Sequence, residues 1–386
     1  MPKSSGFISR PGQKSKMIYR TLGKTGIRLP IVNMGVMNAT NPDLVKRSFE
    51  LGVRHFDTAA YYQRGLNEAM VGKAIEELGV RDKVIIGTKV YVPHEQRPRM
   101  SPAELKKVFL ETAEQSLRRL RTDVLDIFYV HNVQDIGYLN NPGIKEALQI
   151  LKESGKVRHL GCSVHTNMTE LVLDAVRSGF YEVLAVAYNY AMADDSDLKG
   201  ALEQAHAKGI GLIAMKTQCM QYWYRENVPS EKQPYYEGTI SQTAVLKWAL
   251  RHEFITCAIP GYTNFEQMEE DIPVASNLEY TAEERRFLQD RAVKLAAMSY
   301  CRQCGSCLAT CPQGVDIPAL MRAHLYAVCY ANFDLARDTI QGISNGRGLQ
   351  ACVSCRTCTV RCGRRVPVGR RMRDLEIIYG RGGVRA

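Results

Sequence analysis

The chain has 386 residues, of which 45% are hydrophobic and 24% are charged, as is typical of a soluble globular protein. This length exceeds the usual size of one domain and predicts two. The net charge of +11 is concentrated at the ends, because residues 1–28 hold seven Lys or Arg and no acid, and residues 363–386 hold seven Arg against two acids. The segment between these basic ends is nearly neutral, which argues against nucleic-acid binding. No segment has the long apolar run of a membrane helix or the apolar region of a signal peptide. We therefore expect a cytoplasmic protein that binds neither nucleic acid nor membrane.

Short apolar segments alternate with helix-length amphipathic segments along most of the chain. After a basic leader at residues 1–16, residues 19–29 predict a hairpin. Eight strands are expected at residues 31–35, 54–57, 84–89, 125–130, 157–163, 183–187, 211–215 and 256–259. Eight βα units predict an α/β fold, a (β/α)8 TIM barrel over residues 17–298. The doubly wound alternative is disfavoured because no glycine-rich fingerprint follows the first strand.

Two further segments frame this predicted barrel. The loop at residues 217–238 holds five aromatic side chains and follows the seventh strand, so it is expected above the barrel mouth, either as a substrate lid or as a packed-down loop. One helix from Thr281 to about Met298 is expected to lead into a small second domain at residues 299–386.

Four polar side chains are placed at or just beyond the ends of predicted strands: Asp57, Tyr62, Lys89 and His131. The carboxyl ends of barrel strands point into the active-site mouth. Each residue alone has an ordinary explanation, such as a helix cap, a surface charge or a buried imidazole. Together they predict one catalytic site.

These residue types suit the reduction of a carbonyl by hydride transfer. That reaction requires a proton donor at the developing alkoxide, and Tyr62 can serve if a neighbouring cation lowers its pKa from about 10. Lys89 would supply the cation, and Asp57 would hold the ammonium by an ion pair. Neutral His131 would donate a hydrogen bond to the carbonyl oxygen.

The same residues carry a resemblance to a known family. The segments HFDTAAYY, GTKV and DIFYVHNV at residues 55–62, 87–90 and 126–133 resemble the tetrad motifs of the aldo-keto reductases, and IPGYTNFEQMEED at residues 259–271 resembles their late cofactor loop. The resemblance covers about residues 17–280. It implies a nicotinamide-dependent enzyme acting on a small-molecule carbonyl or alcohol, with the four residues above as its catalytic set.

The resemblance also implies a set of cofactor-binding residues: Ser163, Asn189, Met215, Lys216, Pro260, Gly261, Asn264 and Gln267. Gly261 and Gln267 replace the basic residues expected to grip an adenosine 2′-phosphate, and Val164 and Ala185 depart from the amide contacts of the family. The choice between NADPH and NADH stays open.

Two runs of cysteines carry a different chemistry. Cys301, Cys304, Cys307 and Cys311 form a C-x2-C-x2-C-x3-C run, and so do Cys352, Cys355, Cys358 and Cys362. This spacing holds [4Fe–4S] clusters, and the fourth cysteine of each run is expected to ligate the other cluster. Zinc is the rival metal, but four cysteines in one run exceed what zinc needs. The roughly forty residues between the runs have helical periodicity, so the second domain is predicted to be an α-helical ferredoxin-like module with two [4Fe–4S] clusters.

The remaining features leave several functions open. The C-terminal arginines either compensate the charge of the clusters or dock an acidic electron carrier such as ferredoxin. The first hypothesis is that the protein is a carbonyl oxidoreductase whose clusters either transfer electrons or have a structural role. The alternatives are an electron-transfer subunit with a non-catalytic barrel, and a redox-neutral lyase or isomerase that uses Tyr62 as acid and base.

Overall fold

The computed structural model describes residues 16–218, 241–298, 300–352, 355 and 357–380. Eight parallel strands form one sheet within these residues. They are β3 (Met34–Gly35), β4 (His55–Asp57), β5 (Ile85–Val90), β6 (Leu125–Val133), β7 (Val157–Val164), β8 (Val183–Ala187), β9 (Gly211–Met215) and β10 (Cys257–Ala258). Each strand overlaps a predicted segment, and the strands are hydrogen-bonded in chain order.

The sheet closes on itself. Parallel bridges from Val32 to Ala258 and from Gly35 to Gly261 join the first strand to the last. A side chain at Gly35 would place its Cβ 2.8 Å from the carbonyl oxygen of Ile259, so glycine permits this close approach. The predicted (β/α)8 barrel is confirmed. No helix among the described residues has the length and apolar character needed to cross a bilayer.

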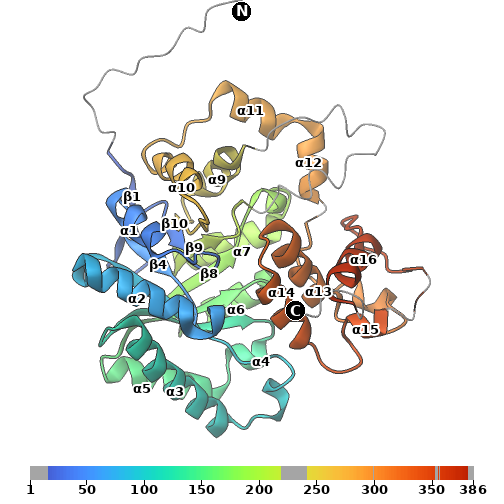
Figure 1. Cartoon of the computed structure of the whole chain (residues 1–386), viewed down its shortest axis with the longest axis horizontal. Coiled ribbons are helices and arrows are strands. Elements are labelled where there is room, and N and C mark those ends of the chain that lie inside the picture. Colours follow the sequence, from blue (N-terminus) through green and yellow to red (C-terminus); the bar gives the residue numbers. More distant parts are fainter. Residues whose placement is uncertain (1–15, 219–240, 299, 353–354, 356, 381–386) are drawn as a thin grey trace, which may run out of the picture.

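Helices cover the outside of the barrel (Figure 1). They are α1 (Pro42–Glu50), α2 (Leu66–Leu78), α3 (Pro102–Leu120), α4 (Ile136–Leu139), α5 (Pro142–Glu153), α6 (Met168–Ser178), α7 (Ser196–Ala207), α9 (Gln242–Leu250) and α10 (Phe265–Asp271). The longest, α3, begins at a capping box in which Ser101 and Glu104 satisfy each other's backbone N–H groups.

The predicted hairpin closes the barrel end that lies away from the site. Strands β1 (Tyr19–Thr21) and β2 (Arg28–Pro30) pair in antiparallel fashion. Leu22 and Leu29 are fully buried against the interior side chains Ile127 and Ile213. Burial of two leucines on this scale stabilises the fold by roughly 3–6 kcal/mol.

The segment after the barrel differs from the predicted single helix. It forms α11 (Ala282–Gln289) and α12 (Arg291–Met298), separated by Asp290, whose ψ of 126° is extended rather than helical. The carboxylate of Asp290 accepts a hydrogen bond from the backbone N–H of Ala292 and so begins the second helix. The interruption lets the chain turn towards the C-terminal region.

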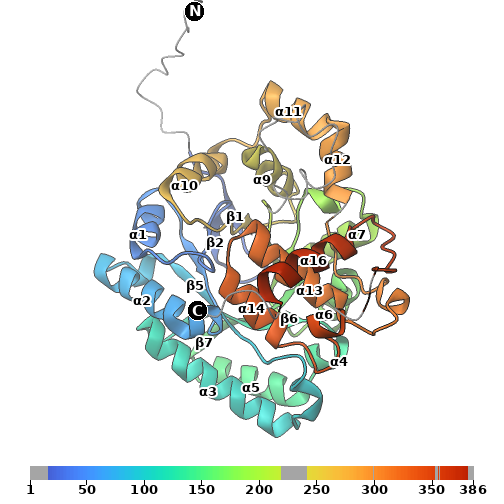
Figure 2. The same cartoon turned by 45° about the vertical axis from the view of Figure 1, so that its right-hand side comes forward.

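The C-terminal region is helical, as predicted. Its elements are α13 (Ile317–His324), a π-helical turn η8 (Leu325–Cys329), α14 (Phe333–Gln341), α15 (Leu349–Cys352) and α16 (Val368–Tyr379). It has a core of its own, in which Leu320, Ala336 and Leu375 are fully buried. Figure 2 shows α13, α14 and α16 in front of one end of the barrel.

Polar contacts hold this region against the carboxyl ends of the barrel strands. Arg302 pairs with Asp194 and with Asp195 at 2.5 Å, and it donates to the carbonyl oxygen of Ala191 at 2.6 Å. Asn332 donates to Asn38, which follows β3, at 2.9 Å. The helical region therefore lies over the mouth in which the catalytic residues were expected.

Candidate active site

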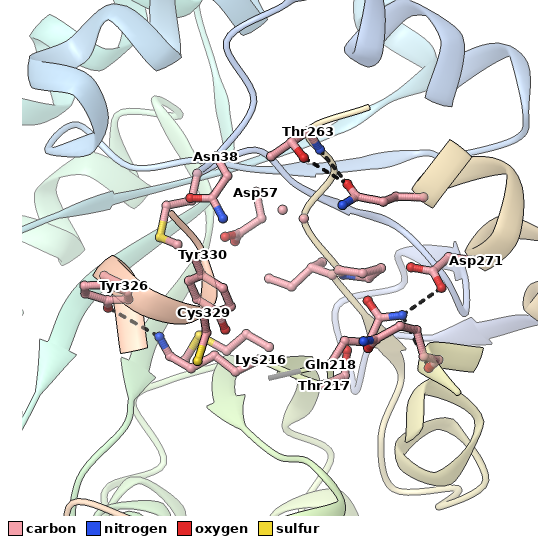
Figure 3. Close-up of a pocket in the computed structure, with 18 of the residues that line it drawn as sticks. Asn38, Asp57, Lys216, Thr217, Gln218, Thr263, Asp271, Tyr326, Cys329 and Tyr330 are labelled. Carbon is pink, nitrogen blue, oxygen red and sulfur yellow. Dashed lines mark hydrogen bonds between the residues drawn. The ribbon is translucent and has the colours of Figure 1, made fainter. Parts of the chain in front are cut away.

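A cavity of about 410 Å³ opens at the carboxyl end of the barrel (Figure 3). Asp57, Tyr62 and His131 line it, and Lys89 lies behind Asp57, joined to its carboxylate. The structure thus brings all four predicted catalytic residues to one place. They come from β4, β5, β6 and the turn after β4, which start far apart in the sequence and converge because parallel barrel strands end at one face.

Lys89 and Asp57 form a buried ion pair. The ammonium of Lys89 is 1% exposed and donates to Asp57 Oδ1 and, at 2.7 Å, to the carbonyl oxygen of Thr58. Removing either partner would leave a buried charge without its counterion, which is costly. The pair therefore fixes the positive charge of Lys89 beneath the cavity.

Tyr62 begins the short 3₁₀ turn η1 (Tyr62–Gly65) and lies close to both Lys89 and His131. The Lys89 ammonium is 5.7 Å from the centre of its ring, and the His131 ring stands edge-on at 5.8 Å. Burial, helped by the charge of Asp57 and by Tyr326, raises the pKa of Tyr62 well above its usual value. The expected net lowering of this pKa is wrong for the ligand-free protein, because burial of the phenol outweighs the effect of the Lys89 ammonium. Tyr62 is therefore a protonated donor at neutral pH.

His131 is neutral, as expected. Burial lowers its pKa well below the usual value, and the nearby charges of Lys89 and Lys216 lower it further. Its Nδ1 atom is buried and has no hydrogen-bond partner among the described residues. A neutral imidazole with an unsatisfied nitrogen at a cavity wall is available to a ligand.

His165 is a second such histidine, which was not among the residues predicted from the sequence. It lies just after β7, lines the cavity, and its buried Nδ1 likewise has no partner in the described part of the chain. Burial lowers its pKa well below the usual value, followed by the charge of Lys216 and by His131. The one sequence signal that could have identified it is its position two residues after Ser163, a predicted cofactor-binding residue.

The predicted cofactor residues divide into two groups. Five of them line the cavity: Met215, Lys216, Pro260, Gly261 and Gln267. Three do not line it, and their side-chain oxygens accept hydrogen bonds from backbone N–H groups instead. Ser163 Oγ accepts from the backbone of Asn132, Asn189 Oδ1 accepts from that of Ala191, and Asn264 caps α10. The Nδ2 atom of Asn189 is buried without a partner among the described residues. The predicted aromatic loop at 217–238 falls outside the described residues except for Thr217 and Gln218.

One end of the cavity is acidic. Glu270 and Asp271 line it beside Gln267, whose Oε1 accepts from the backbone N–H of Thr263 at 2.8 Å. Burial raises the pKa of Asp271 to about 7, although a hydrogen bond from Gln218 opposes the rise. Asp271 accepts that bond at 2.7 Å, which is visible in Figure 3. A phosphate bound at this end would meet carboxyl groups.

The C-terminal region supplies part of the cavity wall, which the sequence did not indicate. Tyr326, Cys329 and Tyr330 line the cavity from η8 and the turn after it. Lys216 donates to the hydroxyl of Tyr326 at 3.3 Å, and its ammonium lies 4.8 Å from the centre of that ring (Figure 3). π-Helical turns are rare and are frequent at functional sites. Cys329 is partly exposed at this wall.

Two groups of cysteines lie elsewhere in the C-terminal region. Four of them line one small cavity of about 20 Å³ with mostly apolar walls: Cys311, Cys352, Cys355 and Cys358. Cys301 is close enough to Cys307 and Cys362 for their charges to add to burial in raising its pKa to about 12. Within the described residues, no three His, Cys, Asp or Glu side chains converge as the ligands of one metal ion do.

Comparison with known proteins identifies the family. The model of the aldo/keto reductase family matches residues 33–238, more than half of the chain. The chain belongs to the aldo/keto reductase family. The match includes the positions of all four tetrad residues and ends before the helical C-terminal region.

Individual aldo/keto reductases share the barrel at low identity. L-glyceraldehyde 3-phosphate reductase of Escherichia coli O157:H7 is 26% identical over 328 residues, covering 72% of this chain and 93% of the relative. L-galactose dehydrogenase of Arabidopsis thaliana is 28% identical over 295 residues, covering 69% and 90%. A Klebsiella pneumoniae aldo-keto reductase, solved in complex with NADPH, has a TM-score of 0.53 at 23% identity over 72% of this chain and 96% of its own, which shows the common fold.

Proposed function

We propose that this aldo/keto reductase is a nicotinamide-dependent oxidoreductase that interconverts a small-molecule carbonyl and its alcohol. One observation carries the proposal: Tyr62 and His131, both uncharged at neutral pH, line a cavity directly above the buried Lys89–Asp57 pair. Two neutral donors next to a fixed positive charge suit an oxygen that gains negative charge during the reaction.

Each of the four residues has a distinct task in this mechanism. A bound nicotinamide supplies or accepts the hydride. The hydroxyl of Tyr62 donates its proton to the carbonyl oxygen, and His131 donates a hydrogen bond that orients the same oxygen. Lys89 stabilises the negative charge that remains on Tyr62, and Asp57 keeps Lys89 in place. In the oxidation of an alcohol, the same groups take the proton back.

The residues around the cavity fit a dinucleotide. A cavity of about 410 Å³ lies within the range of ligand sites in proteins. Met215 would contact the nicotinamide ring, Lys216 would contact a phosphate, and the Pro260–Gly261 segment would lie along the cofactor. The Nδ2 group of Asn189, which lacks a partner among the described residues, would donate a hydrogen bond to the carboxamide oxygen.

The acidic end of the cavity favours NADH over NADPH. Gln267, Glu270 and Asp271 line this end, and Lys216 is the only lysine or arginine among the described residues that line the cavity. A 2′-phosphate carries about two negative charges, so the carboxyl groups at this end would repel it wherever they are ionised, which for the buried Asp271 means above about pH 7. NADH lacks that group and avoids the repulsion.

The experiment is a comparison of Tyr62→Phe with the wild type. Sugars, aldehydes and ketones are first screened anaerobically with NADH and NADPH, and the variant is then tested on the best substrate. We expect a loss of about 10²–10⁴-fold in kcat with nearly unchanged cofactor affinity, because the hydroxyl acts on the transition state. Tyr188→Phe is the control, since Tyr188 is buried against Trp248 and does not line the cavity. Equal turnover by Tyr62→Phe would refute the tetrad mechanism, and no binding of either nicotinamide would favour the redox-neutral or electron-transfer alternative.

We also propose that the C-terminal region holds two [4Fe–4S] clusters and forms a separate domain from residue 299 onwards, with the barrel at residues 17–298. Cys311 and the first three cysteines of the second run line one cavity, which is the crossed ligand set expected from the sequence. The neighbourhood of Cys301, Cys307 and Cys362 suits the other set. A cubane spreads its four thiolates over four iron atoms, so these ligands need not converge as around a single ion. Bound clusters would supply single-electron transfer.

Iron and sulfide analysis tests the clusters without reference to activity. Anaerobically purified protein should contain close to eight iron and eight acid-labile sulfide per chain, and dithionite should bleach its visible absorbance. Cys311→Ser should disturb mainly the cluster held by Cys352, Cys355 and Cys358, whereas Cys257→Ala, a buried barrel cysteine, should leave both clusters intact. Stoichiometric zinc without sulfide would refute the assignment.

The partner proposed for these clusters is an acidic single-electron carrier of the ferredoxin type. Four arginines near the second run are exposed: Arg361, Arg365, Arg370 and Arg373. Complementary charge speeds the encounter of such partners and is screened by salt. Electron transfer to an acidic ferredoxin should therefore slow as ionic strength rises, and a rate independent of salt would argue against this partner.

A further inference from the structure

A second, smaller cavity lies beside the catalytic residues. It measures about 30 Å³, and Tyr62, His131, His165 and Tyr326 line both it and the larger cavity. We call it the Arg322 chamber, because Arg322 of α13 reaches it from the C-terminal region. The chamber is large enough for a few polar atoms of a ligand.

The chamber is surrounded by positive charge. Arg322 is 7% exposed and donates a hydrogen bond to the neutral side chain of Gln303 at 3.0 Å. Among the described residues, neither Arg322 nor Lys216 forms an ion pair with a carboxylate, and Lys216 donates to the hydroxyl of Tyr326. Arg97, 7% exposed, donates to carbonyl oxygens and leaves Nη1 without a partner.

No carboxylate among the described residues lines the chamber. The carboxylate of Asp57 is paired with Lys89, and that of Asp338 is hydrogen-bonded to Tyr61. The histidines are held neutral, and their Nδ1 atoms are unsatisfied. Buried cations are normally paired, so the buried Arg322, which lines the chamber beside two histidine nitrogens that lack a partner among the described residues, indicates a site for a negative group.

We propose that the Arg322 chamber binds an anionic group of the substrate, a carboxylate or a phosphate, so that the enzyme acts on anionic carbonyl compounds. This inference rests on the proposed oxidoreductase function. Because the chamber shares Tyr62 and His131 with the catalytic site, the anionic group lies close to the reacting carbon. The specificity then comes from the C-terminal region as well as from the barrel.

The first test compares matched pairs of substrates on the holoenzyme with NADH. Suitable pairs are pyruvate and pyruvamide, galacturonate and galactose, and glyceraldehyde 3-phosphate and glyceraldehyde. The anionic member of at least one pair should have a kcat/KM about 10–100-fold higher, as expected for hydrogen bonds to a charged group. A preference in the first two pairs identifies a carboxylate, and a preference in the third identifies a phosphate.

Substitutions then assign the preference to the chamber. Arg322→Gln removes the charge but keeps a donor for Gln303, so the anionic preference should fall about 10–100-fold, mainly through KM. Arg322→Lys keeps a cation without the planar fork and should retain an intermediate preference. Arg337→Gln is the control, because Arg337 is exposed on α14 and pairs only with Asp334.

A binding measurement separates this inference from the proposed function. Calorimetric titration with oxamate, a non-reducible mimic of a 2-oxo acid, and with inorganic phosphate should show that one of them binds the wild type and that Arg322→Gln weakens it. If no carbonyl is turned over but this binding pattern holds, the chamber stands and the oxidoreductase function fails. If the pairs are turned over with equal kcat/KM and Arg322→Gln changes neither their ratio nor anion binding, the chamber proposal is overturned while the function stands.

Discussion

Asp271 allows a quantitative test of the electrostatics at the acidic end of the cavity. It is 3% exposed, and burial raises its pKa from 3.8 to about 7. In the unfolded chain the carboxyl ionises above pH 3.8, whereas in the folded protein it stays protonated up to about pH 7. The folded state therefore binds an extra proton in this window, so stability falls as pH rises towards 7 and levels off above it.

The size of the effect follows from the shift. About three pH units at about 1.4 kcal/mol each give a penalty of about 4 kcal/mol at pH 8 and about 1.7 kcal/mol at pH 5. Asp271→Asn removes the ionisation and keeps the oxygen that accepts from Gln218. The stability of this variant relative to wild type should therefore rise by about 2.5 kcal/mol between pH 5 and pH 8.

Thermal unfolding of both proteins, measured anaerobically from pH 5 to pH 8, provides the assay. A change of about 2.5 kcal/mol corresponds to roughly 5–10 °C in the difference of the midpoints for a barrel of this size. Asp334→Asn, at a carboxylate that is 89% exposed, is the control and should give a difference that does not vary with pH. If the Asp271→Asn difference is equally constant, the carboxyl is ionised in the folded protein and the reasoning fails.

Three further predictions concern the barrel. Lys89→Met should lower kcat by about 10²-fold or more and also lower the melting temperature, because Asp57 is left as an unpaired buried charge; unchanged steady-state rates would contradict the role of Lys89. Gln267→Arg should improve NADPH binding relative to NADH, measured by cofactor fluorescence, because it adds a cation at the acidic end. Gly35→Ala should destabilise the protein by about 1–3 kcal/mol in thermal unfolding, because its Cβ would lie 2.8 Å from the carbonyl oxygen of Ile259; an unchanged midpoint would mean that the two segments separate easily.

The barrel could be predicted from the sequence because its strands are local patterns. Parallel strands covered on both faces are continuous apolar segments, and at least one helix separates each strand of the barrel from the next. The break at Asp290 could not be foreseen, since the helical pattern of residues 281–298 continues across it. The helix is interrupted there because the chain has to turn towards the C-terminal region, and local sequence patterns do not reveal such tertiary contacts.

Only those residues of the candidate site that lie at the ends of barrel strands could be predicted from the sequence. Asp57, Lys89 and His131 were found because each follows an apolar strand, and the geometry brings them together. The pKa of Tyr62 was misjudged because proximity to a lysine in the sequence pattern does not reveal how deeply the phenol is buried. Tyr326 and Arg322 were missed because nothing in a helical segment three hundred residues from the first strand indicates which surface it covers.

The position of Gln303 links the cysteine-rich loop to the barrel site. It lies between Cys301 and Cys304, is 3% exposed, and adopts a φ of 55°, which is unfavourable for a residue with a side chain. Its Oε1 accepts from Thr166, next to His165, at 3.1 Å and from Arg322 at 3.0 Å. The shape of the loop around these cysteines thus determines where a hydrogen-bond acceptor for Arg322 stands. A change in the loop reaches the Arg322 chamber through two hydrogen bonds, although neither of these cysteines lines either cavity at the barrel mouth.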